Sequence, residues 1–161
     1  MNDLSMMVDE GIKLNVRTTG IFTKDGKVLV HYSEKDGHYA LPGGRIKAGE
    51  DSMQALQREV REEIGAEIKN IFSMGVMENF FKTAKCNYHE YMWMIKAEFE
   101  DNSFYESERV YGYEDDDGEK LIFDWIDIDK LDQVDFRPNA AIPYIKNLDG
   151  KVHHVINHTE K

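Results

Sequence analysis

Three glutamates at helical spacing are the residues of this sequence best suited to carry out chemistry. Glu59, Glu62 and Glu63 lie in the stretch REVREEIG. On a helix that turns about 100° per residue, their side chains fall within one arc of roughly 100° and repel one another. A cation would relieve that repulsion, and a set of oxygen ligands favours Mg²⁺, Mn²⁺ or Ca²⁺ over Zn²⁺. The same spacing also occurs on solvated helix faces with ion pairs, so the triplet alone leaves both interpretations open.

Neighbouring residues fit a metal site as well. Arg58 lies four residues before Glu62 and can pair with it on a helix. Gly43 and Gly44 carry no side chains, so the backbone at this turn can approach a ligand closely.

The segment from Gly44 to Ala66 resembles the Nudix box. That signature reads G-x5-E-x7-R-E-U-x-E-E-x-G-U, where U is a bulky aliphatic residue. Every fixed position of the signature matches, and the matching residues are Gly44, Glu50, Arg58, Glu59, Glu62, Glu63 and Gly65. Val60 satisfies the first aliphatic position, whereas Ala66 is smaller than the last one requires. The smaller side chain affects packing of the helix end more than chemistry.

The resemblance implies both a fold and an activity. The fold is an α/β/α sandwich, an α+β arrangement in which helices flank a mixed β-sheet and the box forms a loop-helix-loop. The activity is hydrolysis of a diphosphate bond in a nucleoside diphosphate linked to another moiety. Mg²⁺, for which Mn²⁺ can substitute, would neutralise charge on the diphosphate and activate the attacking water.

The resemblance also implies roles for individual residues. Glu59 and Glu63 are the main metal ligands by position, with Glu62 close to the metal. The carbonyl of Gly43 or Gly44 is a backbone ligand. Two further box residues orient the carboxylates, and these are Arg58 and Glu50.

The general base stays open at this point. Family members take it from the box or from a later loop, and it must reach the attacking water. The candidates are Glu62, Glu78, Glu106, Glu108, Glu114 and Glu119.

Substrate contacts are expected from strands outside the box. Arg17 precedes the box and can meet a phosphate or form a surface ion pair. Glu78-Asn79-Phe80-Phe81, followed by His89-Glu90, resembles a pattern in some uncharacterised Nudix proteins. A functional reading places Glu78 and Glu90 near the metals and Phe80 or Phe81 against a base. The other reading is a strand with alternating faces.

A predicted helix from Asp51 to Ile64 positions the glutamates. Asp51 can cap this helix with Gln54 as its capping-box partner, and Gly65 can end it. An apolar stripe at helical spacing faces the core and consists of Met53, Leu56, Val60 and Ile64.

Strands are predicted on both sides of the helix, over residues 13–22, 27–32, 68–81, 88–99 and 121–128. Asn139 to Asn147 is predicted as a short helix, and 151–158 as a final strand or a loose tail. The stretch 101–120 is long, polar and acidic, and its unbroken acidic run from Glu114 to Asp117 is predicted as a solvated loop. This order predicts a mixed sheet covered by helices.

Composition favours one compact domain over residues 1–161, with 41% hydrophobic residues for a core. The net charge of -11 disfavours general nucleic-acid binding and leaves a small nucleotide-type substrate as the expected partner. The start of the sequence lacks a secretory pattern and no apolar run is long enough for a membrane span. With Cys86 as the single cysteine, we expect a cytoplasmic protein without membrane association. The sequence leaves a monomer and a homodimer open.

A second class of function is a non-catalytic Nudix-like domain that senses a nucleotide. Such a domain has no chemical need for all three box glutamates, so their presence favours an enzyme, a Nudix-type pyrophosphohydrolase. Markers of some substrate groups are missing, because Lys82 and Ala84 stand where ADP-ribose and dinucleoside polyphosphate enzymes carry proline and tyrosine. The substrate is therefore open within the class.

Overall fold

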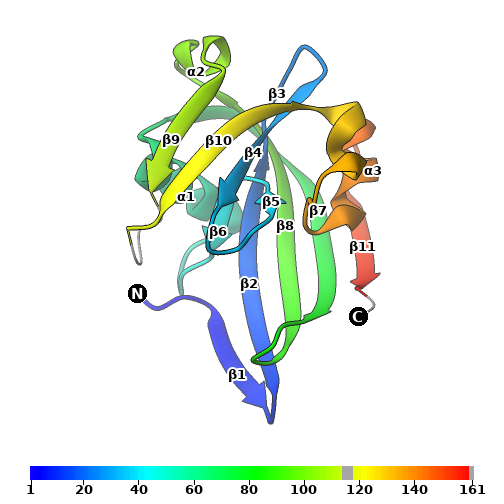
Figure 1. Ribbon diagram of the computed structural model, residues 1–161. Coiled ribbons are helices and arrows are strands. Elements are labelled where there is room, and N and C mark those ends of the chain that lie inside the picture. The colour runs from blue at the N-terminus through cyan, green and yellow to red at the C-terminus, as the bar shows by residue number, and fades with distance from the viewer. Residues whose placement is uncertain (114–117, 160–161) are drawn as a thin grey trace.

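A mixed sheet forms the centre of the computed structural model, which describes residues 1–113 and 118–159 (Figure 1). Its strands follow the order β1-β2-β8-β7-β11, and β6 pairs with β2. β2 runs parallel to β8 and β11 parallel to β7, whereas the remaining pairs are antiparallel. The strand bounds are β1 (Ser5–Asp9), β2 (Ile12–Ile21), β6 (Gly43–Arg45), β7 (Ile68–Lys82), β8 (Asn87–Phe99) and β11 (His153–His158).

A second, antiparallel sheet packs beside the first. Its order is β3-β4-β10-β9, and β5 pairs with β4. The bounds are β3 (Thr23–Lys24), β4 (Lys27–Ser33), β5 (Tyr39–Ala40), β9 (Arg109–Tyr113) and β10 (Lys120–Asp127). The sequence predicted β4 and β10 but not their separation from the mixed sheet, because periodicity identifies strands without showing which strands pair.

Helices cover both faces of the mixed sheet. The α-helices are α1 (Ser52–Ile64), α2 (Ser103–Glu106) and α3 (Ile142–Lys146), and the 3₁₀ helices are η1 (Ile128–Gln133) and η2 (Asn139–Ala141). Met94 and Ile95, successive residues of β8, belong to different buried clusters; Leu56 of α1 joins the cluster of Ile95, and Ile142 of α3 that of Met94. The predicted mixed sheet flanked by helices is confirmed. No helix in the described residues is long and apolar enough to cross a membrane.

Two elements of regular structure lie in the long acidic stretch 101–120. Helix α2 and strand β9 lie within it, and β9 pairs with β10 through a regular antiparallel ladder. Gly112 of β9 packs so closely against the end of α1 that an added Cβ would lie 2.4 Å from the Glu63 carbonyl oxygen. The acidic run Glu114 to Asp117 lies outside the described residues. Tertiary packing thus orders a stretch whose composition resembles a loop.

The two ends of the chain form edge strands of the mixed sheet. The sequence did not predict β1, which pairs with β2. Of the two alternatives for 151–158, the strand is observed: β11 pairs in parallel with β7. The helix predicted from Asn139 begins with the 3₁₀ turn η2 and continues as α3.

Candidate active site

Helix α1 begins and ends where the sequence indicates. The Asp51 carboxylate accepts hydrogen bonds from the backbone N–H groups of Met53 and Gln54, at 2.9 and 2.8 Å, and the Gln54 side chain accepts one from the Asp51 N–H. Gly65 ends the helix in the left-handed region at φ 69°. Leu56 is buried as predicted, but Met53 is 36% exposed, so the apolar stripe begins one turn later than expected.

The glycine turn before the helix has no room for side chains. A Cβ on Gly43, whose φ is 144°, would lie 2.1 Å from the Thr18 carbonyl oxygen. A Cβ on Gly44 would lie 2.4 Å from the carboxyl carbon of Glu59. Strand β6 therefore brings bare backbone directly against a box carboxylate, the close approach expected of these glycines.

Arg58 joins the loop before the helix to the box carboxylates. Its Nε and Nη2 donate to the two carboxylate oxygens of Glu50 at 2.6 and 3.0 Å, and Nη2 also donates to the carbonyl of Arg45. Its Nη1 donates to Glu59 at 2.7 Å and to Glu62 at 3.0 Å. The predicted pairing of Arg58 with Glu62 is confirmed. One guanidinium thus fixes three carboxylates, which suits its planar fork of donors.

The carboxylates bonded to Arg58 lie in different electrostatic environments. Hydrogen bonding to Arg58 lowers the pKa of Glu50 from its usual value. Burial raises the pKa of Glu59, and the hydrogen bond from Arg58 opposes that shift only in part. A buried carboxylate with a raised pKa gains from a nearby positive charge. Glu59 is therefore a side chain that a cation would stabilise in its ionised form.

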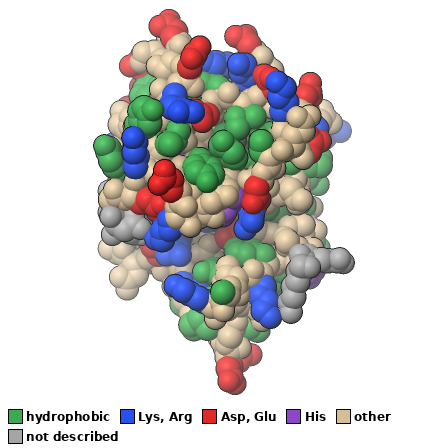
Figure 2. All heavy atoms as spheres, in the orientation of Figure 1, with side chains coloured by type: hydrophobic (Ala, Val, Ile, Leu, Met, Phe, Trp, Pro, Cys, Tyr) green, Lys and Arg blue, Asp and Glu red, His purple; other side chains and the backbone are tan. Residues whose placement is uncertain are grey.

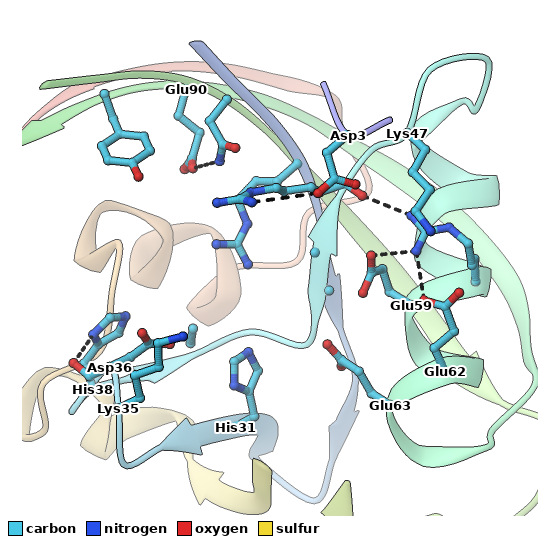
Figure 3. A pocket seen from close by; sticks show the side chains of 18 of the residues that line it. Asp3, His31, Lys35, Asp36, His38, Lys47, Glu59, Glu62, Glu63 and Glu90 are labelled. Atoms are coloured by element: carbon cyan, nitrogen blue, oxygen red, sulfur yellow. Dashed lines mark hydrogen bonds and ion pairs between the residues drawn. The ribbon is translucent and has the colours of Figure 1, made fainter. Parts of the chain in front are cut away.

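A cleft of about 430 Å³ opens beside this end of the helix. In the space-filling view of Figure 2, charged side chains of both signs border a hollow near the middle of the face. Figure 3 shows Glu59, Glu62 and Glu63 on one side of the cleft and Glu90 on another, with His31 below. The sequence-predicted residues that line it are Arg17, Gly43, Gly44, Arg58, Glu59, Glu62, Glu63, Phe81 and Glu90.

The cleft offers oxygen ligands for a divalent cation. Glu59, Glu62 and Glu63 line the cleft together with the backbone of Gly43 and Gly44. Within the described residues, no three acidic, histidine or cysteine side chains converge closely enough to hold an ion by themselves. The oxygen atoms of these groups suit a divalent cation that completes its ligand shell with water and substrate phosphate.

The structure separates the residues expected to bind substrate. Arg17 lines the cleft, and its buried Nε makes no hydrogen bond to the described residues. Glu78 and Phe80 lie on the opposite face of β7, where Glu78 pairs with His154 at 2.6 Å and Phe80 stacks on His158. The reason is the two-residue period of a strand, which turns Asn79 and Phe81 toward the cleft instead.

The structure also lowers the number of candidates for the general base. Of those in the described residues, only Glu62 lines the cleft. Glu119 accepts hydrogen bonds from Ser33 and from the backbone of Lys35, and Glu108 borders a separate depression near Trp125. Glu106 lies in α2, and Glu114 is outside the described residues.

Further residues line the cleft that the sequence did not predict. His31 on β4, together with Lys35 and His38 in the turn that follows, comes from the second sheet. Asn15 precedes Arg17 by two residues on β2 and therefore faces the same side. The signal available for Asn15 was the alternation of β2, which places Lys13, Asn15 and Arg17 on one face and Leu14 and Val16 on the other. No sequence signal showed that His31 of β4 would line the same cleft as the glutamates of α1.

The buried His31 in the cleft should make the stability of the protein depend on pH. Burial lowers its pKa from 6.5 to about 3, and the positive charges of Arg17 and His38 act in the same direction. The folded protein keeps His31 neutral while the unfolded chain protonates it, so this histidine costs stability as pH falls from 6.5 toward 3. Between pH 7 and 5.5, wild type should lose about 1 kcal/mol more unfolding free energy than His31→Gln. Urea unfolding at both pH values measures this, and parallel pH dependence in the two proteins would contradict it.

Comparison with known protein families shows which family the chain belongs to. A model of the NUDIX domain matches residues 13–148. The chain belongs to the Nudix family of hydrolases. This membership confirms the resemblance and the class of enzyme predicted from the box.

Individual relatives match over shorter segments. A U8 snoRNA-decapping enzyme from Homalodisca vitripennis is 40% identical over 50 residues, which are 31% of this chain and 26% of that protein. An ADP-ribose pyrophosphatase from Methanocaldococcus jannaschii is 40% identical over 53 residues, 31% of each chain. The chain thus matches less than a third of the length of these curated relatives.

Solved structures share the fold of this protein over most of the chain. A mutator MutT protein from Bacillus halodurans superposes with a TM-score of 0.63 and 18% identity, covering 89% of both chains. At this identity the likeness shows the fold alone. The fold and family are therefore shared, while the choice of substrate depends on the residues of the cleft.

Proposed function

We propose that this protein hydrolyses a diphosphate bond in a nucleoside diphosphate linked to another moiety, with Mg²⁺ as its cofactor. The supporting observation is that Glu59, Glu62 and Glu63 line one cleft with the glycine turn and Arg17. Carboxylates for a cation and a basic group for phosphate thus border the same space. The single cysteine, Cys86, fits a reducing compartment, and a cytoplasmic location is part of this proposal.

Each cleft residue has a proposed task. Glu59 and Glu63, with a carbonyl of Gly43 or Gly44, would hold Mg²⁺, which neutralises diphosphate charge and lowers the pKa of bound water. Arg17 donates from its buried Nε to a phosphate oxygen. Glu62 accepts the proton of the attacking water as the new P–O bond forms and the P–O bond to the leaving group breaks.

Arg58 and Glu50 act by positioning. Glu50 receives two hydrogen bonds from Arg58 and one from the backbone N–H of Lys47, so its carboxylate is held from two sides. The guanidinium is thereby fixed with Nη1 toward Glu59 and Glu62. Holding carboxylates in place before substrate arrives reduces reorganisation during the reaction.

The alternative function is a non-catalytic domain that senses a nucleotide. It requires a binding cleft but no set of cation-binding carboxylates. The buried Glu63 and the buried contact of Glu59 with Gly44 would have no evident use in such a domain.

A substrate screen tests the proposed function. Purified protein with Mg²⁺ is incubated with nucleoside diphosphate sugars, dinucleotides and nucleoside triphosphates, and released phosphate is read after phosphatase coupling. We expect Mg²⁺-dependent turnover of at least one diphosphate compound, abolished by EDTA. Binding of nucleotides without any turnover across the panel would favour the sensor instead.

Metal binding should depend on Glu63. We expect Mn²⁺ to bind wild type weakly without substrate, because water completes its ligand shell, and to bind Glu63→Gln about tenfold or more weakly. Titration followed by the paramagnetic signal of free Mn²⁺ measures both affinities. Glu67→Gln is the matched control, since Glu67 pairs with Arg61 at the surface. Equal affinity in wild type and Glu63→Gln would remove Glu63 from the metal site.

A further inference from the structure

A row of polar side chains crosses the mixed sheet on its cleft side. Strand register aligns Asn157 of β11 with Asn79 of β7, Asn79 with Glu90 of β8, and Glu90 with Asn15 of β2. The hydrogen bonds along this row measure 2.8, 3.3 and 2.7 Å. Asn15, Asn79 and Glu90 are at most 5% exposed. Buried polar groups of this kind occur where they are satisfied or where they bind something.

Glu90 fixes the direction of every amide in the row. The two oxygens of its carboxylate accept hydrogen bonds from Asn15 and Asn79, which both turn their Nδ2 groups toward it. Turning either amide over would place a carbonyl oxygen against the carboxylate. The Oδ1 atom of Asn15 is therefore an acceptor, and it is buried without a hydrogen-bond partner in the described residues.

Asn15 Oδ1 and the Glu90 carboxylate thus place two acceptors side by side at this end of the cleft. Both residues line the cleft, and the Glu90 carboxylate has lone pairs beyond the two that the amides occupy. A buried acceptor without a partner costs free energy that a donor of a ligand would recover. The ligand group that fits here carries two neighbouring N–H donors.

The surroundings suit a planar heterocycle. Phe81 and Tyr88 line this end of the cleft and stack on each other, with ring centroids 4.7 Å apart and planes 3° from parallel. Figure 3 places Glu90 across the cleft from Glu59, Glu62 and Glu63. A base at the acceptor pair would therefore have its phosphates free to extend toward the box carboxylates. Aromatic walls with polar groups that read a base edge are the usual means of recognising an unpaired base.

We propose that Asn15 and Glu90 read the N1–H and 2-amino donors of guanine, which makes guanosine diphosphate derivatives the preferred substrates. This inference rests on the proposed function. Guanine carries two adjacent donors on one edge. Adenine and cytosine place a donor beside an acceptor, and uracil flanks its N–H with carbonyl oxygens, so each would bring an acceptor against an acceptor. A site built to receive hydrogen bonds discriminates strongly against ligands that lack the donor.

The test compares substrates that differ only in the base. We would measure kcat/KM with Mg²⁺ for guanosine, inosine, adenosine and uridine diphosphate glucose. Inosine lacks the 2-amino group, so kcat/KM for the guanosine compound should be about tenfold higher than for the inosine compound. It should be at least a hundredfold higher than for the adenosine and uridine compounds. Calorimetric binding of guanosine, inosine and adenosine diphosphates reports the same preference without turnover.

Two variants assign the preference to Glu90. Glu90→Gln keeps the shape but replaces one acceptor with a donor, and it should reduce the guanosine-to-inosine ratio to near one. Glu78→Gln is the matched control, because Glu78 lies on the opposite face of the same sheet and pairs with His154. It should keep the full ratio. Thermal unfolding of each variant shows that its fold is intact.

The outcomes separate this inference from the proposed function. Turnover with equal kcat/KM for the four bases overturns the inference and leaves the function standing. Tighter binding of guanosine diphosphate than of inosine and adenosine diphosphates, without turnover of any substrate, supports recognition of guanine by Asn15 and Glu90 and overturns the proposed function. If kcat/KM of Glu90→Gln falls equally for all four bases, Glu90 acts only in the fold, and the inference is overturned.

Discussion

Glu59→Gln should lower kcat by roughly two to four orders of magnitude, about 3–5 kcal/mol of barrier. Glutamine keeps the size of the side chain and one oxygen, so it can still accept the hydrogen bond from Arg58. It loses the charge that would hold a cation at the backbone of Gly44. Since a cation stabilises charge that develops on the diphosphate, the loss should fall on the rate.

The thermal stability of Glu59→Gln shows whether the loss of turnover comes from lost chemistry or from a lost fold. Glu59 is partly buried beside Glu62, and removing one charge relieves both burial and repulsion. The metal-free unfolding temperature of Glu59→Gln should therefore stay close to that of wild type or rise slightly. Glu67→Gln, a surface acid just beyond the helix, is the control for turnover. Turnover in Glu59→Gln equal to wild type would mean that the box is a scaffold here.

Arg58→Lys should lower the free energy of unfolding by about 2 kcal/mol or more. The Arg58 side chain is 18% exposed, and its guanidinium donates to Glu50, Glu59 and Glu62 at once. A lysine ammonium keeps the charge but cannot make the paired bonds to Glu50 and also reach the other two carboxylates. Three crowded carboxylates would then lose most of their hydrogen bonds, so turnover should fall as well.

A matched variant and the pH dependence of stability both test the expected effect of Arg58→Lys. Arg61→Lys makes the same change three residues later, at an exposed pair with Glu67, and should alter stability little. Arg58 lowers the pKa of Glu50, so the stability from this pair is present above the usual pKa of 4.5 and is lost as pH falls through the lower folded value. The difference between wild type and Arg58→Lys should therefore narrow in acid. Equal losses in Arg58→Lys and Arg61→Lys would contradict the central role of Arg58.

The local features of the site could be predicted because short-range rules govern them. Asp51 with Gln54 and Gly65 set the ends of α1 through capping and a left-handed residue, and both are properties of neighbouring residues. Helical spacing then placed Glu59, Glu62 and Glu63 on one edge. The pairing of Arg58 with Glu62 followed from the same geometry.

Side-chain direction on the strands could not be predicted in the same way. The segment Glu78 to Phe81 was correctly predicted as strand, but alternation alone leaves open which face meets the cleft. Pairing with β8 turns Asn79 and Phe81 inward and leaves Glu78 with His154 outside. A shift of one residue in register would have reversed this assignment.

The sequence by itself determined the family, the capped helix and the set of box carboxylates, since each depends on residues close together in the chain. Only the tertiary structure decided what those carboxylates face. Asn15, His31 and Glu90 come from three strands far apart in sequence and meet at the cleft through strand pairing and the packing of two sheets. Such contacts depend on which surfaces bury each other. Periodicity within one segment carries no record of that choice.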